Sequence, residues 1–350
     1  MKRPFLILLA VLLLICIPLT FVPAQAKQLR IGYITRLSVP WWIVCEKGFT
    51  DAAAKLGFKP VIYHPPQLTV EDQVRVLESW VAAGIDGVLI GPNDPAAPIN
   101  AINSAIDAGV PVICGYGVDS PDSKRLLFEG YDGTALGVAF AKGLVASLKL
   151  AGKKPPGKIS YHTGGMQSTE DVASYDGFKG VVEAAGYTLI EPVLDGGDPA
   201  KALASASETI SLYPDLVGML GYYDYTGPAL GKAVTDADKI GQIIVVAGLI
   251  GQVVPYMKSG AVSGVIDFVQ YDGSYRAAEM LYKLAKAGKA GWTKVLQSYK
   301  KDYPANKMEL QGFGWVTATK VNMQKWPEIS WIMPLDEHQK KYPKVWEILK

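Results

Sequence analysis

The chain alternates repeatedly between short apolar segments and amphipathic ones. In the first series the apolar segments are 29–34, 61–63, 87–90 and 110–113, and each is predicted to be a strand. Between them, segments with apolar residues at helical spacing begin near Pro40, Thr69 and Asp94 and end at a glycine. Strands and helices that alternate with short connections are typical of a parallel sheet with helices on both faces.

A second series follows, with predicted strands at 158–161, 188–192, 216–220 and 243–247. The two series contain similar segments, DGVLIGPNDPAAPINAI and LVGMLGYYDYTGPALGKAV. Each has an apolar strand, a glycine, two further residues, an aspartate and then a helix. We therefore predict an α/β protein of two Rossmann-like lobes with parallel sheets. Ligands of such sheets lie at the carboxyl ends of the strands, so the functional residues are expected in those loops.

The first 26 residues have the features of a secretory signal peptide. Lys2 and Arg3 precede an apolar run at 6–21, and an Ala-x-Ala pattern ends at Ala26. We predict cleavage after Ala26 and a mature protein in the periplasm; an uncleaved anchor and a lipidated Cys16 are the alternatives. No later segment is expected to span a membrane.

Composition argues against several classes of protein. Hydrophobic residues make up 49% of the 350 residues and charged residues 19%, as in a folded chain rather than a disordered one. Without Lys2 and Arg3, the 35 basic residues fall to 33 and balance the 33 acidic ones, so the basic excess of a nucleic-acid binder is absent. Three histidines and three cysteines are few for a multinuclear metal site, and we predict neither a metal nor a cofactor. After cleavage Cys45 and Cys114 remain, either paired or as buried thiols.

The sequence also lacks the common catalytic motifs. It contains no G-x-G-x-x-G, G-K-[ST], C-x-x-C, H-E-x-x-H or G-x-S-x-G pattern, and no nucleophile stands beside a base. We therefore predict that the protein is not an enzyme. His162 ends a predicted strand, where it is placed to contact a ligand. Asp94 and Asp224 precede predicted helices, and helix capping is the alternative interpretation of both.

Several segments, taken in order, resemble the ribose-binding-protein-like (type 1) family of periplasmic solute-binding proteins of ABC transporters. They include IGYITRLSVPWWIVCEKGFTDAAAKLGF, with its Pro-aromatic-aromatic triplet, and VLESWVAAGIDGVLIGPNDPAAPINAINSAIDAGVPVICGYGVD. YDGTALGVAFAKGL and GWVTATKVNMQKW continue the resemblance, which covers about residues 29–326. Each motif is weak alone, and their order and spacing carry the resemblance.

The resemblance implies two lobes joined by three crossings of the chain, which close like a clamshell on one small ligand. The crossings are expected near 131–132, 270–272 and 300. They divide the chain into an N-terminal lobe (27–131 and 272–300), a C-terminal lobe (132–271 and 301–325) and a C-terminal extension (326–350). The extension is expected to pack at the periphery, with docking to a partner as the alternative. A monomer is the family expectation.

The aromatic part of the family's binding site is present in this sequence. Trp41 and Trp42 occupy the Pro-aromatic-aromatic positions, which in the family stack against a sugar. An aromatic face matches the apolar face of a sugar ring and also attracts cations. One of the two is expected to face the cleft. The tyrosines expected at the same site are Tyr116, Tyr131, Tyr175, Tyr222, Tyr223 and Tyr225.

The polar part of the family's binding site is largely replaced. Where the family has Asn, Asp or Arg, this chain has Val39, Gly91, Tyr116-Gly117, Ser174, Tyr223 and Leu249 or Ile250. The polar residues that remain near the strand ends include Arg36 and Asn93. The predicted ligand-binding residues are Thr35, Trp41, Trp42, Asp94, Tyr116, Asp132, Gln167, Tyr175, Tyr223, Asp224, Asp267 and Gln270.

These residues favour a small sugar-like solute, which the protein is predicted to deliver to an ABC importer. Buried charges are costly unless the ligand pairs with them, so their loss favours a modified or deoxy sugar over a fully hydroxylated aldose. The alternative is a co-receptor for a sensor kinase or chemoreceptor. It would bind a methylated amine or another non-sugar in an aromatic cage, with Asp224 or Asp267 balancing the charge.

Overall fold

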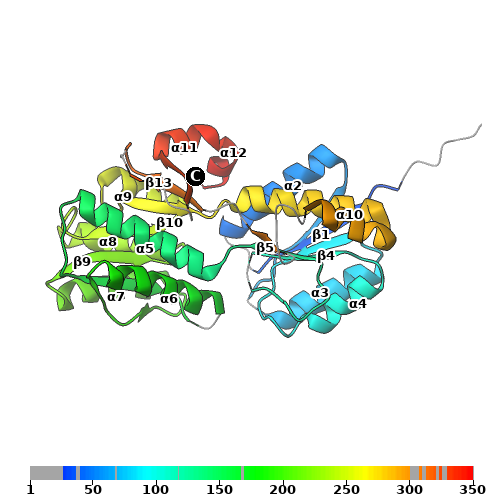
Figure 1. Cartoon of the computed structure of the whole chain (residues 1–350), viewed down its shortest axis with the longest axis horizontal. Helices are drawn as coiled ribbons and strands as arrows, with labels where there is room; N and C mark the ends of the chain where they lie inside the picture. The colour runs from blue at the N-terminus through cyan, green and yellow to red at the C-terminus, as the bar shows by residue number, and fades with distance from the viewer. Residues whose placement is uncertain are drawn as a thin grey trace, which may run out of the picture.

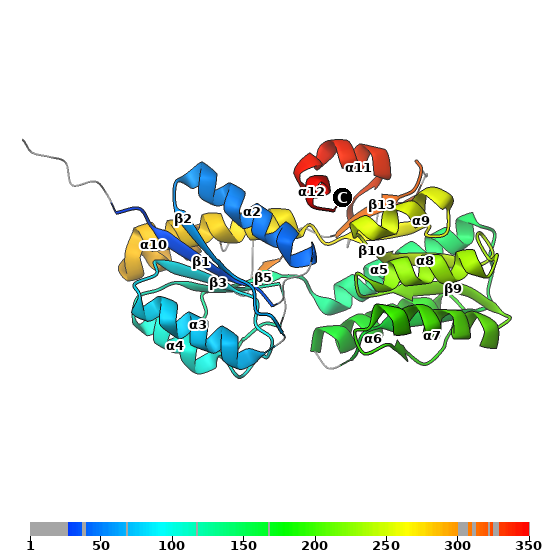
Figure 2. The same cartoon turned by 180° about the vertical axis from the view of Figure 1, so that it is seen from behind.

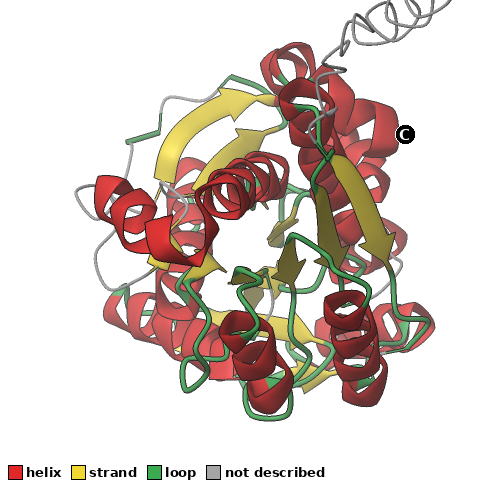
Figure 3. Ribbon diagram, turned by 90° about the vertical axis from the view of Figure 1, so that its right-hand side faces the viewer, coloured by secondary structure: helices red, strands yellow, loops and turns green. Residues whose placement is uncertain are grey.

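The computed structural model describes residues 27–36, 40–67, 69–116, 118–166, 169–299, 307–309, 313–320, 323–324 and 329–349. Figures 1 and 2 show two α/β lobes that lie side by side along the longest axis of the molecule. Figure 3 views the molecule along that axis, with one lobe behind the other. The predicted signal peptide at 1–26 and the predicted ligand residue Gln167 lie outside the described residues.

The first lobe is built on a parallel sheet of six strands in the order β12-β5-β4-β3-β1-β2. The strands are β1 (Arg30–Ile34), β2 (Lys59–Tyr63), β3 (Gly87–Ile90), β4 (Val112–Gly115), β5 (Leu127–Gly130) and β12 (Lys307–Glu309). The helices of this lobe are α2 (Pro40–Leu56), α3 (Val70–Ala82), α4 (Ile99–Asp107) and α10 (Gln270–Tyr299). Every residue of β3, β4 and β5 is buried, because helices or loops cover both faces of the sheet.

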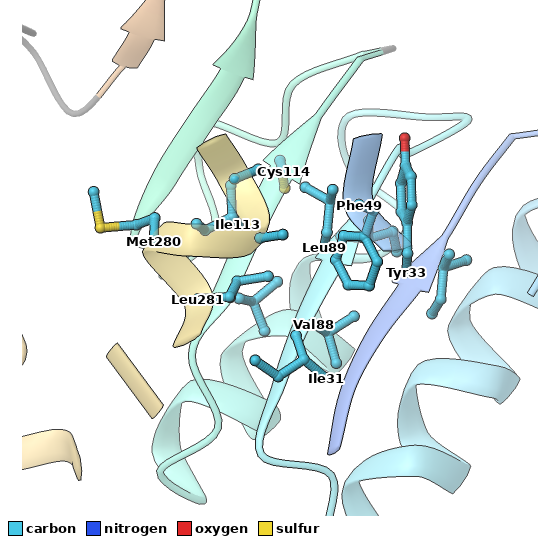
Figure 4. Close-up of a cluster of buried hydrophobic side chains, with 14 of the residues drawn as sticks. Ile31, Tyr33, Phe49, Val88, Leu89, Ile113, Cys114, Met280 and Leu281 are labelled. Carbon is cyan, nitrogen blue, oxygen red and sulfur yellow. The ribbon is translucent and has the colours of Figure 1, made fainter. Parts of the chain in front are cut away.

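The core of the first lobe joins the central strands to α2 and α10. Figure 4 shows side chains of β1, β3 and β4 packed against Phe49 of α2 and Met280 and Leu281 of α10. Cys45 and Cys114 are buried in this core as free thiols rather than as a disulfide. Burial raises the pKa of the Cys114 thiol to about 12, which suppresses the reactive thiolate.

The second lobe is built on a sheet in the order β14-β13-β11-β10-β9-β6-β7, with β8 paired to β6. The strands are β6 (Lys158–Thr163), β7 (Thr188–Leu189), β8 (Val193–Leu194), β9 (Leu216–Gly221), β10 (Ile244–Gly248), β11 (Gly264–Asp267), β13 (Phe313–Thr317) and β14 (Ile329–Pro334). The helices are α5 (Gly133–Leu150), α6 (Thr169–Ala184), α7 (Pro199–Leu212), α8 (Thr226–Asp236), the short η1 (Gly251–Val253), α9 (Val254–Ser259), α11 (Leu335–Lys341) and α12 (Pro343–Leu349). All pairs are parallel except β11 with β13.

Helix α5 is the one described helix that is long and apolar enough to cross a membrane. It packs against α6 and against strands β9 and β10, and eleven of its residues are buried. Its apolar character is therefore explained by its place in the core of the second lobe.

The chain passes from one sheet to the other three times, between β5 and α5, between β11 and α10, and between β12 and β13. The third passage lies after Glu309, later than the predicted position near 300, because β12 pairs with β5 and belongs to the first lobe. Residues of the predicted extension also differ from expectation, since β14 pairs with β13 and continues the second sheet. Helices α11 and α12 then return to the junction of the lobes (Figure 1).

Candidate functional site

A cleft of about 190 Å³ lies between the two lobes, at the carboxyl ends of their strands. The first lobe contributes residues that follow β1 and β4 and the first turn of α2. The second lobe contributes the loop after β9 and the first turn of α6, and two residues come from the first and second passages between the sheets. The lining residues are Arg36, Trp41, Trp42, Tyr116, Tyr131, Asp171, Tyr222, Tyr223, Asp224 and Phe268.

Aromatic rings from both lobes meet around Trp41. Its ring centroid lies 4.7 Å from that of Trp42, 5.4 Å from that of Tyr116 and 6.2 Å from that of Phe268, each in an edge-on arrangement. Trp42 is largely buried in the core of the first lobe, whereas Trp41 is partly exposed and packs against the cores of both lobes. The tryptophan pair therefore supplies one ring, Trp41, that a ligand reaches more freely than the other.

Three charged side chains line the cleft, so its polar half is less depleted than the sequence predicted. Arg36 comes from the first lobe, and its Nε donates to Asn93 Oδ1 at 2.9 Å. Asp171 and Asp224 come from the second lobe. Arg and carboxylate groups that face each other across a cleft can hold sugar hydroxyls as donor and acceptors.

The two carboxylates are held by neighbouring groups. Asp171 is buried, and its Oδ2 accepts a hydrogen bond from the hydroxyl of Tyr223 at 3.3 Å. Asp224 Oδ1 accepts the backbone N–H of Tyr225 at 2.9 Å. Burial raises the pKa of Asp224, and burial followed by the charge of Asp171 raises that of Tyr223. A ligand that donates hydroxyl protons to these carboxylates would offset the cost of their burial.

Of the predicted ligand residues, five line the cleft: Trp41, Trp42, Tyr116, Tyr223 and Asp224. The structure brings these five together, while their contact with a ligand stays a prediction. Six other predicted residues lie outside the lining and are engaged elsewhere: Thr35, Asp94, Asp132, Tyr175, Asp267 and Gln270. Hydrogen bonds and packing contacts elsewhere in the protein explain the positions of most of these six side chains.

Two of the six are aspartates that order the backbone. Asp94 Oδ1 accepts the N–H groups of Ala96 and Ala97 at 2.8 and 2.7 Å. Asp132 is the N-cap of α5 and accepts the N–H of Ala135 at 2.9 Å. Asp132 is therefore a helix cap, whereas Asp94 holds the turn that precedes α4, whose N-cap is Pro98.

Three of the other four contact partners that the sequence did not indicate, and the fourth, Gln270, is buried. Thr35 is buried, with its hydroxyl 2.8 Å from His64 Nδ1. Tyr175 packs edge-on against Tyr161, with ring centroids 5.3 Å apart. Asp267 bonds to His338 at 2.9 Å, and Gln270 is buried at the start of α10. His162 is also buried outside the cleft lining, with Nε2 3.0 Å from Ser160 Oγ.

Sequence reasoning missed Asp171 and Phe268 entirely. Asp171 lies in the first turn of α6, which begins at Thr169. The pair of acids at Glu170 and Asp171 is the signal that marks this helix start. Phe268 follows β11 directly, and its position at a strand end could have identified it.

No metal or cofactor was predicted, and in the described part of the chain no three His, Cys, Asp or Glu side chains are grouped to hold a metal ion. The aromatic faces and the few polar groups that line the cleft fit an organic solute, whose orientation the polar groups would fix.

Comparison with known proteins gives a consistent result. A family model described as a periplasmic binding protein domain matches residues 33–290. The D-ribose/D-allose-binding protein of Pseudomonas aeruginosa is 27% identical over 203 residues, which are 56% of this chain and 61% of that protein. The ribose import binding protein RbsB of Bacillus subtilis is 33% identical over 88 residues, which are 25% of this chain and 28% of that protein. The matched part thus spans less than two thirds of either relative.

Solved structures share the fold. An ABC transporter solute-binding protein from Burkholderia graminis, in complex with D-arabinose, has a TM-score of 0.71 at 20% identity and aligns over 85% of this chain and 99% of its own. Another from Actinobacillus succinogenes, with bound D-allose, has a TM-score of 0.71 at 19% identity over 83% of this chain and 98% of its own. The predicted α/β fold of two parallel-sheet lobes is confirmed, and the matched proteins are binding proteins rather than enzymes.

Proposed function

Because this chain belongs to the periplasmic binding protein family, we propose that it captures one small sugar in the cleft between its lobes and delivers it to an ABC importer. The observation that carries the proposal is the composition of the cleft, with Trp41 and six other aromatic residues beside Arg36, Asp171 and Asp224. Aromatic rings pack on the C–H face of a sugar, and charged groups bond its hydroxyls. The names of the relatives, which bind ribose, allose or arabinose, support the same class of ligand.

Capture requires groups from both lobes. Arg36 and Trp41 belong to the first lobe, whereas Asp171 and Asp224 belong to the second. A sugar that contacts both sets binds the closed arrangement more tightly than an open one and therefore shifts the population toward closure. The importer then recognises the closed form. We place this step in the periplasm, after cleavage of the predicted signal peptide at Ala26.

Calorimetric titration of the purified protein tests the ligand class. D-ribose, D-allose and D-arabinose are compared with trimethylamine N-oxide, the probe for the alternative ligand class. We expect one of the sugars to bind with a stoichiometry of one and Asp171→Asn to weaken it about tenfold, since a charged hydrogen bond is lost. Asp176→Asn is the matched control, because Asp176 is exposed on the same helix. Binding of the amine oxide but of no sugar would contradict the proposal.

The receiving partner is tested separately. We expect purified permease and ATPase from the same operon to respond to the sugar-loaded protein with increased ATP hydrolysis. A sensor kinase whose autophosphorylation responds to the loaded protein, with no effect on a transporter, would replace the importer in the proposal.

A further inference from the structure

Helices α11 and α12, the C-terminal helix pair, lie beyond residues 33–290 that the family model matches. Leu335, Val345 and Trp346 of the pair are buried in the core of the second lobe. Helix α12 also packs against α2, which belongs to the first lobe (Figures 1 and 2). The pair is thus anchored on one lobe and contacts the other.

A buried hydrogen-bonded chain connects the pair to the second passage between the sheets. The His338 side chain is fully buried, with Nε2 2.9 Å from Asp267 Oδ2, and Trp346 Nε1 donates to His338 Nδ1 at 2.9 Å. An indole N–H only donates, so Nδ1 is the acceptor and Nε2 carries the proton that is donated to Asp267. The other oxygen of Asp267 accepts the N–H of Val269 at 2.8 Å. His338 therefore holds the carboxylate that orders the passage.

The passage itself is conformationally constrained. Val269 has a φ of 54°, in the left-handed region that a β-branched residue rarely adopts. Such a backbone angle persists only where surrounding contacts fix it. The bond from Asp267 to the Val269 N–H is one such contact, and His338 fixes Asp267 in turn.

A second connection reaches the first lobe at Asp51 of α2. Its Oδ2 lies 2.7 Å from Lys344 Nζ of α12 and accepts the Tyr271 hydroxyl at 2.6 Å, while Oδ1 lies 2.5 Å from Lys47 Nζ. Burial opposes ionisation of Asp51, but hydrogen bonds from Lys344, Lys47 and Tyr271 outweigh it and lower its pKa to about 2. Tyr271 lies in the first turn of α10, two residues after Val269. Together with the bonds of His338, these contacts connect the C-terminal helix pair to residues on both sides of the second passage.

We propose that the C-terminal helix pair braces this passage, with His338 as its positioning residue, and so sets the resting angle between the lobes and the free energy of closure. The inference rests on the proposed capture of a sugar by closure. Contacts of His338 and Trp346 are buried and hold the pair on the second lobe. Lys344 is 57% exposed, so lobe rotation can make and break its contact with Asp51. A contact that differs between open and closed forms shifts their populations.

The test measures the distance between lobes in the full-length protein without ligand. Ser79→Cys on α3 and Glu208→Cys on α7 place labels at exposed positions, while the buried native thiols stay unlabelled. Trp346→Phe keeps a ring but removes the donor to His338, and Lys344→Ala removes the contact with Asp51. Lys340→Ala, at an exposed residue of α11, is the control.

We expect the interlobe distance distribution to broaden in Trp346→Phe and Lys344→Ala and to match the parent in Lys340→Ala. Affinity for D-ribose, used as the probe, is expected to fall about threefold in the first two variants because preorganisation is lost. Unchanged distance distributions in both variants, whatever their melting temperatures, would overturn the proposal. The interlobe distance is measured without ligand, so it tests the brace even if no sugar binds. A wrong ligand class would therefore leave this result unaffected.

Discussion

Two loops with similar sequences occupy equivalent places in the two lobes but contribute differently to the cleft. After β3 of the first lobe, a Cβ on Gly91 would lie 3.0 Å from the Trp42 ring and 2.8 Å from the Tyr116 carbonyl oxygen. Trp42 therefore covers this loop, and the carboxylate of Asp94 accepts hydrogen bonds from the loop backbone. After β9 of the second lobe, Tyr222, Tyr223 and Asp224 all line the cleft.

The two loops differ because the packing over each one determines whether its side chains line the cleft. In the first lobe, the start of α2 brings tryptophans over the sheet end, so the helix rather than the strand loop forms the wall. In the second lobe, the strand loop itself forms the wall. A carboxylate at the same motif position is consequently structural in one lobe and available to a ligand in the other.

The largest expected effect on ligand affinity tests the first-lobe wall. Trp41→Ala should weaken sugar binding about 30-fold, equivalent to ~2 kcal/mol, because a partly exposed ring that lines the cleft is lost. Titration calorimetry measures the change. Ile43→Ala is the control, since Ile43 is exposed on the same helix. Equal affinities for the two variants would show that the tryptophan does not contact the ligand.

A smaller effect compares the two aspartates directly. Asp224→Asn should weaken sugar binding about tenfold, because one acceptor of the cleft loses its charge. Asp94→Asn should leave affinity unchanged and lower the free energy of unfolding by about 0.5–1 kcal/mol, as expected for weakened hydrogen bonds from this side chain to the turn backbone. Affinity and chemical denaturation are measured for both. A loss of affinity in Asp94→Asn would remove the distinction between the loops.

The lobes should also differ in how pH affects their stability. Burial raises the pKa of Glu129 in the first lobe to about 7, although Arg276 opposes the shift, and burial lowers that of His162 in the second lobe to about 3. The contribution of Glu129 is thus complete below about pH 4.5 and is lost as pH rises through 7. That of His162 is complete above about pH 6.5 and is lost as pH falls through 3.

Denaturation of Glu129→Gln and His162→Gln between pH 3 and 8 tests these opposite slopes. Each variant should differ from the parent by a slope of at most ~1.4 kcal/mol per pH unit, over pH 4.5–7 for Glu129 and pH 3–6.5 for His162. Parallel profiles for the parent and both variants would contradict the assignment.

The smallest effect concerns the two cysteines of the first lobe. Because Cys45 and Cys114 are unpaired, a reducing agent should leave the melting temperature unchanged. Ellman's reagent should react with both thiols only after unfolding, since both are buried. A reductant-dependent fall in melting temperature would instead indicate a disulfide.

Much of the fold and part of the site could be predicted from the sequence. Apolar segments located β1 to β4, β6, β7, β9 and β10 but not β5, β8, β11, β12 or β14, and the Pro-Trp-Trp triplet placed Trp41 and Trp42 at the cleft, because both signals are local. Asp171 was missed because no apolar periodicity marks the first turn of α6. Asp267 was expected at the ligand, but its partner His338 lies 71 residues later on a helix whose position only tertiary packing defines.

Native mass spectrometry of the protein purified without refolding tests directly whether the cleft captures a sugar. We predict a bound neutral species with the mass of a single pentose, hexose or deoxy sugar, absent from Trp41→Ala and retained in Ile43→Ala. A bound methylated amine, or a sugar adduct of equal intensity in both variants, would contradict capture of a sugar in this cleft.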